Sequence, residues 1–123
     1  MAAQIDFWGE ILTAKVRRTP LVALREQAAL LGPKTKNLVE ATVDTSVSEG
    51  TFIHRFSLVV PVLDGYTYEL FAVTHGIRLY PVRVRETKLT LPSEAAFLSW
   101  LRRELSSAKT KTIIANLLAQ ATS

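Results

Sequence analysis

The sequence predicts an α+β fold, in which a four-stranded, mainly antiparallel sheet (a meander) is flanked by two N-terminal and two C-terminal helices. Two observations lead to this prediction. Strand patterns rich in β-branched and aromatic residues are grouped within residues 37–85, whereas residues 4–31 and 93–121 carry apolar residues at helical spacing. Between two strand patterns lies Asp64-Gly65, a dipeptide that supplies the positive φ angles of a tight hairpin turn.

Two helices are expected before the sheet. The first covers residues 4–17, where Ile5, Trp8, Ile11, Leu12 and Val16 recur on one face. Thr19-Pro20 then separates the helices, because threonine caps a helix and proline is favoured at the first helical position. The second helix is expected to end at Leu31, before Gly32-Pro33.

Three strand patterns come next. Residues 37–47 alternate between apolar and polar residues, which predicts a half-buried strand near an edge of the sheet. Residues 52–60 and 66–73 form a hairpin around Asp64-Gly65. Both faces of residues 66–73 contain apolar side chains, and this predicts a central strand that is covered on both faces at one end at least.

The fourth strand is expected over residues 77–85, where strict alternation fails at Pro81. A β-bulge at Pro81 would restore the phase, since proline cannot donate to a ladder and often lies at a bulge or an edge. The apolar face would then carry Ile77, Leu79, Val82 and Val84. The opposite face would carry a stripe of Arg78, Tyr80, Arg83 and Arg85.

Two helices are expected after the sheet. Ser93 is the predicted N-cap of the first, and Ser106-Ser107 separates it from a second helix that begins at Ala108. The last helix has a large apolar face for a terminal element. Its candidate interface residues are Ile113, Ile114, Leu117 and Leu118.

Composition narrows the class of protein. A chain of 123 residues is expected to form a single domain, residues 1–123. It has no cysteine, no apolar run long enough for a bilayer and no basic region before an apolar core at the N-terminus. We therefore expect a cytoplasmic protein with no membrane partner. The net charge of +4 permits an acidic partner or nucleic acid without requiring either.

No pattern in the sequence indicates catalysis, a metal or a cofactor. His54 and His75 are the only histidines, and no further ligands surround them at metal-site spacing. The five glycines are scattered, so there is no phosphate-binding loop. We predict no catalytic residues, no metal site and no cofactor.

Three functions remain as hypotheses. The first is a non-catalytic protein-interaction or regulatory module that acts through a homodimer or a partner protein. The alternative is a small basic nucleic-acid-binding protein that uses the Arg/Tyr stripe, because arginine contacts phosphate and aromatic rings stack on bases. A hydrolase or nuclease using Asp64, Glu69 or His75 is a distant third.

Overall fold

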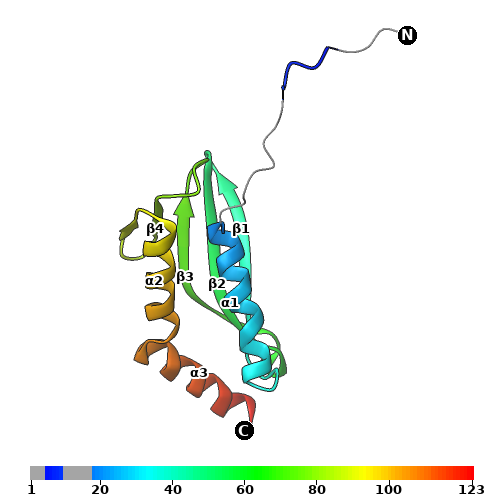
Figure 1. The fold of residues 1–123 in the computed structure, drawn as a ribbon. Helices are drawn as coiled ribbons and strands as arrows, with labels where there is room; N and C mark the ends of the chain where they lie inside the picture. The colour runs from blue at the N-terminus through cyan, green and yellow to red at the C-terminus, as the bar shows by residue number, and fades with distance from the viewer. Residues whose placement is uncertain (1–4, 10–17) are drawn as a thin grey trace, which may run out of the picture.

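The computed structural model describes residues 5–9 and 18–123 (Figure 1). Within these residues a helix is followed by the strands of one sheet and then by two further helices. The elements are α1 (Pro20–Lys34), β1 (Glu40–Ser48), β2 (Thr51–Val60), the 3₁₀ turn η1 (Pro61–Leu63), β3 (Tyr66–His75), β4 (Val82–Val84), β5 (Thr90–Leu91), α2 (Glu94–Leu105) and α3 (Ala108–Ala121).

The strands form one sheet in the order β1-β2-β3-β4-β5, and each is antiparallel to the next. The predicted α+β class and antiparallel meander are confirmed. The details differ, because the sheet has five strands rather than four and three helices are described rather than four. The additional strand is β5, where Leu91 pairs with Val82.

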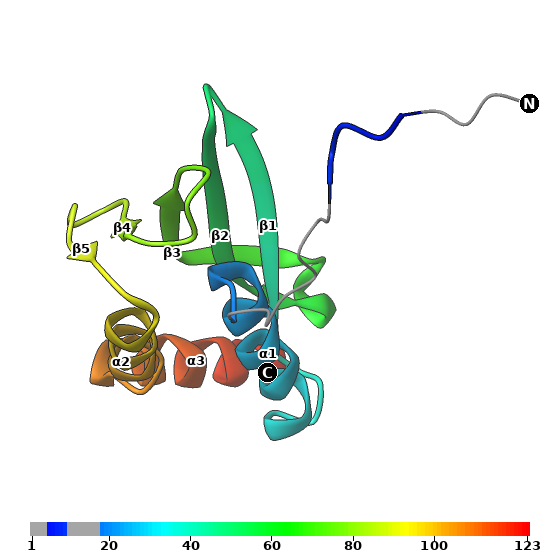
Figure 2. The same ribbon diagram turned by 45° about the horizontal axis from the view of Figure 1, so that its top comes forward.

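All three helices pack on one face of the sheet, as Figure 2 shows. Helices α1 and α2 cover the main core cluster, whose central side chains include Leu24 and Phe97. Helix α3 covers a second cluster, in which Leu117 packs with Val39, Leu58 and Val60. The other face of the sheet carries no described helix, and we call it the open face.

The N-terminal helix predicted over residues 4–17 falls largely on residues 10–17, which lie outside the described residues. Residues 5–9 are described, and they are not helical. The Asp6 carboxylate accepts a hydrogen bond from the Trp8 backbone N–H at 2.8 Å. Gly9 has a φ of +65°, which a right-handed helix does not allow. Local side-chain bonding of this kind competes with helix formation.

Helix α1 begins as predicted and ends later. The Thr19 hydroxyl accepts a hydrogen bond from the Val22 N–H at 3.1 Å, which caps the helix before Pro20. The helix continues through Gly32-Pro33 to Lys34. Proline in the last turn removes only one hydrogen bond, and the Thr35 backbone N–H then closes the helix on the carbonyls of Leu31 and Gly32.

A β-bulge lies in β3, not at Pro81. Phe71 pairs with Phe56 and Glu69 pairs with Ser57, so Leu70 is an extra residue without a partner in the ladder. The Leu70 side chain packs against both core clusters. An extra residue reverses the alternation of a strand, and residues on either side of it exchange faces.

This bulge explains why both faces of residues 66–73 contain apolar residues in the sequence pattern. Before Leu70 the even-numbered residues face the helices, and after it the odd-numbered residues do. Most of the apolar residues therefore face the helices. Ala72 lies on the other face and is buried as well, which fits the prediction that the strand is covered on both faces at one end. The open face of β3 carries Thr67, Glu69, Ala72 and Thr74.

The fourth strand is much shorter than predicted. Only Val82–Val84 pair with β3, because β3 ends at His75 and leaves residues 76–81 no strand to pair with. Val82 and Val84 are buried as expected, but Ile77 is exposed. The predicted bulge at Pro81 is therefore wrong, since Pro81 precedes the strand.

Candidate functional site

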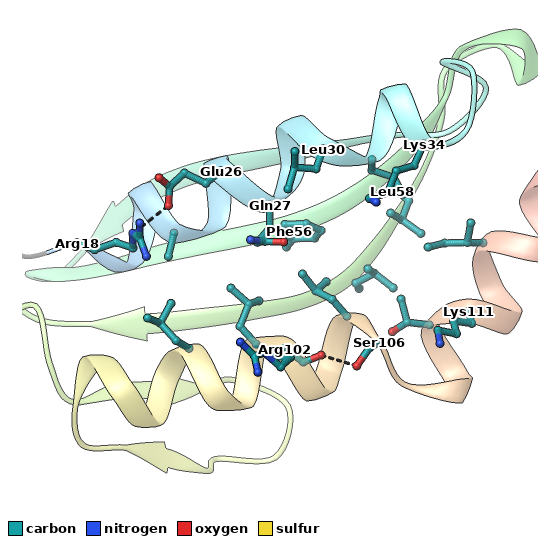
Figure 3. Close-up of a pocket in the computed structure, with 18 residues that line it drawn as sticks. Arg18, Glu26, Gln27, Leu30, Lys34, Phe56, Leu58, Arg102, Ser106 and Lys111 are labelled. Atoms are coloured by element: carbon teal, nitrogen blue, oxygen red, sulfur yellow. Dashed lines mark hydrogen bonds and ion pairs between the residues drawn. The ribbon is translucent and has the colours of Figure 1, made fainter.

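Helices α1 and α2 lie apart on the sheet, with β2 and β3 visible between them (Figure 1). The space between them is a groove of about 640 Å³, which we call the α1/α2 groove. This volume falls within the range of small-molecule and peptide sites. Figure 3 shows that side chains from α1 and α2 form its two walls, while strands form the floor and α3 closes one end.

The floor of the groove is apolar. Phe56 and Leu58 come from β2, at alternate positions that face the helices. Leu70 comes from β3, where it is the extra residue of the bulge. Leucines of α1 and α2 continue the apolar surface up both walls: they are Leu30, Leu31, Leu98, Leu101 and Leu105.

The rim of the groove is basic. Its cationic side chains are Arg18, Lys34, Arg102 and Lys111, against a single carboxylate, that of Glu26. Arg18 is paired with this carboxylate, Nε to Oε1 at 3.0 Å. Within the described residues no acidic group pairs with Lys34, Arg102 or Lys111. The groove thus combines an apolar floor with a surplus of positive charge at its edge.

The predicted stripe of Arg78, Tyr80, Arg83 and Arg85 does not form one surface. The Tyr80 ring lies 6.3 Å from the Phe97 ring, on the helix side of the sheet, and its hydroxyl donates to the Arg18 carbonyl at 3.0 Å. Arg83 pairs with Thr74 and Thr90, which places it on the open face. Arg78 is exposed in the segment between β3 and β4.

A charged network crosses the open face. Arg85 donates to Glu69 at 3.2 Å, and Glu69 also lies 3.8 Å from the Arg55 guanidinium. Arg55 in turn contacts Asp44 at 3.6 Å and donates to the Ser46 hydroxyl at 2.9 Å. Two of the arginines on this face therefore already bind carboxylates.

A shallow depression of about 230 Å³ lies at the His75 end of the sheet. Arg83 lines it together with three threonines, Thr51, Thr74 and Thr90. A guanidinium surrounded by hydroxyl groups is suited to an anion such as phosphate. Of the four residues of the predicted stripe, Arg83 is the one that lines this depression.

His54 and His75 form a buried pair between β2 and β3. Their Nε2 atoms are 2.9 Å apart. His75 Nδ1 lies 2.8 Å from the Gly76 carbonyl, so it carries a proton and leaves Nε2 as an acceptor. His54 then donates from Nε2 and accepts from the Thr45 hydroxyl at Nδ1, 2.9 Å away. Burial, together with the charges of the nearby His75 and Arg25, lowers the pKa of His54 to about 4.

The residues of the hydrolase hypothesis do not meet. Asp64 precedes β3 and His75 ends it, so they are separated by the whole strand, roughly 30 Å at 3.3 Å per residue. Glu69 is held by arginines. Among the described residues no three His, Asp or Glu side chains gather as metal ligands would.

The predicted interface residues of α3 face the protein's own sheet. Leu117 is buried, and Ile113, Ile114 and Leu118 are half-buried against the cluster around Val39. Ile114 also lines the α1/α2 groove. Contact between this face and a partner stays a prediction.

Comparison with family models, with curated proteins and with solved structures finds no match for this chain. In the part of the chain that the structure describes, no helix has both the length and the apolar character required to cross a bilayer.

Sequence reasoning missed the groove. Its walls come from helix positions that the 3.6-residue pattern assigns to the core, and nothing in that pattern shows that α1 and α2 lie apart. One signal was present in the sequence. Leu30 in α1 and Leu98 in α2 make the apolar face of each helix wider than contact with the sheet alone requires. Such wide stripes predict a second neighbour for each helix.

Proposed function

We propose that the protein is a non-catalytic protein-interaction module that binds an amphipathic helix of a partner protein in the α1/α2 groove. The observation that carries this proposal is the apolar floor bordered by Lys34, Arg102 and Lys111, which have no acidic partner among the described residues. A helix laid in a groove is recognised by apolar anchors at positions i, i+3, i+4 and i+7. The basic rim favours a partner whose apolar face is flanked by aspartate or glutamate.

Arg102 is the rim residue best suited to test this proposal. It is exposed on α2, so its replacement leaves the core intact. We expect Arg102→Glu to weaken binding of an acidic amphipathic peptide about tenfold at low salt, because the rim then repels the peptide. The probe is a labelled 16-residue helical peptide with leucine anchors and flanking glutamates, measured by fluorescence polarisation.

Arg103→Glu is the matched control. Arg103 is the adjacent exposed residue of α2, and it does not line the groove. Both variants change the net charge equally, so non-specific attraction would weaken binding equally in the two. Equal losses in the two variants would contradict the proposal.

A second candidate function is binding of single-stranded nucleic acid on the open face. The depression around Arg83 favours it, although the neighbouring arginines are already neutralised by Asp44 and Glu69. Under this candidate an oligonucleotide would bind with an affinity that falls steeply with salt, and Arg83→Glu would abolish binding. Arg103→Glu serves again as the control of equal charge. Binding that is insensitive to Arg83→Glu would remove this candidate.

A further inference from the structure

The N-terminal segment Ile5–Gly9 exposes three large apolar side chains. Ile5 is 78% exposed, Phe7 90% and Trp8 81%. Single exposed apolar residues are common on protein surfaces, but three within four positions are typical of a binding surface. The same segment carries one acidic residue, Asp6.

This segment matches the α1/α2 groove in chemistry. Aromatic rings such as those of Phe7 and Trp8 bury large apolar areas and are frequent anchors in interfaces. The floor of the groove offers apolar surface from Phe56, Leu58 and Leu70. The Asp6 carboxylate would lie near cations that have no acidic partner among the described residues.

The segment is also tethered close to the groove. Arg18 lines one end of the groove, and Trp8 precedes it by ten residues (Figure 3). Ten residues span at most about 35 Å when fully extended. The segment and the groove belong to one chain, so docking of the segment in its own groove would not depend on the protein concentration.

We propose that residues 5–9 are an intramolecular ligand of the α1/α2 groove and that they regulate it by competing with the partner helix. This inference rests on the proposed function, since it assigns a regulator to the same groove. Phe7 and Trp8 are exposed in the structure, and docking in the groove would bury them. A partner with higher affinity displaces the segment, and a weaker one does not bind.

Trp8 is a direct probe of the docked state. The chain has two tryptophans, and the other, Trp100, is buried in the core. Subtracting the emission of a Trp8→Ser variant from that of the wild-type chain isolates the Trp8 signal. The variant Leu30→Glu places a carboxylate on the groove wall and should prevent docking of the segment. We therefore expect acrylamide to quench the Trp8 signal about threefold less in the wild type than in Leu30→Glu.

The control variant is Val22→Glu. Val22 and Leu30 are both exposed residues of α1, but only Leu30 lines the groove. Trp8 should stay protected from acrylamide in Val22→Glu. Its protection should also be the same at about 1 μM and at about 100 μM protein, because an intramolecular contact does not depend on concentration. Trp8 that is equally accessible in all variants would overturn the inference. Protection that grows with protein concentration would also overturn it, because the segment would then occupy a second copy.

The double variant Phe7→Ser/Trp8→Ser separates this inference from the proposed function. It should bind the acidic amphipathic peptide about tenfold more tightly than the wild type, because the internal competitor is gone. Equal affinity would overturn the competition and leave the proposed function standing. A double variant that does not bind the peptide would overturn the proposed function instead, since its groove has no internal occupant.

Discussion

Lowering the pH from 7 to 4 is expected to reduce the free energy of unfolding by about 3 kcal/mol through His54 alone, because burial holds the pKa of this residue at about 4. Above pH 6.5 the imidazole is neutral in both the folded and the unfolded chain. Between pH 6.5 and pH 4 the unfolded chain binds a proton that the folded chain does not. Stability therefore falls through this window, and the contribution of His54 levels off once the pH is below the folded pKa of about 4.

The contacts of His54 explain why its protonation is unfavourable. Its Nε2 faces His75 Nε2 at 2.9 Å, so a second proton on the pair would bring two N–H groups together. Its Nδ1 faces the Thr45 hydroxyl, and the ring is buried between strands. The positive charge of Arg25 adds to this effect. Among the described residues no carboxylate contributes to the shift of this pKa.

His54→Gln isolates this contribution from those of the carboxylates. A glutamine amide can accept from the Thr45 hydroxyl and donate to His75, as neutral His54 does, but it does not titrate. Urea unfolding of both proteins should be measured between pH 7.5 and pH 4. We expect the wild type to lose about 3 kcal/mol relative to the variant. If the free energies of unfolding of the two proteins change with pH in parallel, then His54 has the same pKa in the folded and the unfolded chain.

The histidine pair also shows what the sequence could indicate and what it could not. The absence of spaced ligands around His54 and His75 predicts a structural or merely solvated role, and the hydrogen bonds of the buried pair fit the structural role. Their contact depends on the register of the hairpin, in which His54 pairs with Val73 and Phe52 with His75. Strand patterns predict the hairpin, but they do not determine its register residue by residue.

The bulge illustrates the same limit. Two features of the sequence indicate a change of phase: alternation fails around Pro81, and residues 66–73 have apolar residues on both faces. Only residues 66–73 contain a bulge. Near Pro81 the phase is lost because the ladder has ended. Periodicity cannot distinguish an extra residue within a strand from the end of a strand, since both interrupt the pattern.

The core beneath α2 depends on this bulge and could not be predicted without it. Strict alternation from Tyr68 places Phe71 on the open face, but the extra residue Leu70 turns Phe71 toward the helices. There the Phe71 ring meets Trp100 of α2 edge-on. Phe71 and Trp100 lie far apart in the sequence, so no local pattern reveals that they are in contact.

Phe97→Ala is expected to lower the free energy of unfolding by about 3–5 kcal/mol, the cost of removing a fully buried phenylalanine and leaving a cavity. Phe97 lies within a series of ring contacts, between Tyr80 at 6.3 Å and Trp100 at 6.2 Å. Trp100 meets Phe71 edge-on at 4.9 Å, and Phe71 stacks on Phe56 at 5.1 Å. The series connects α2 to the floor of the groove.

Two comparisons make this prediction specific. Phe97→Leu keeps most of the apolar volume, so it should cost less than about 1.5 kcal/mol. Val22→Ala, at an exposed position of α1, should change stability by no more than about 0.5 kcal/mol. Urea unfolding measures all three variants, and near-ultraviolet circular dichroism reports on Trp100. If Phe97→Ala costs no more than Phe97→Leu, then α2 is not anchored to the sheet through this ring. The wall of the groove would then depend on Leu101 and the contacts of β5 instead, since these also join α2 to the core.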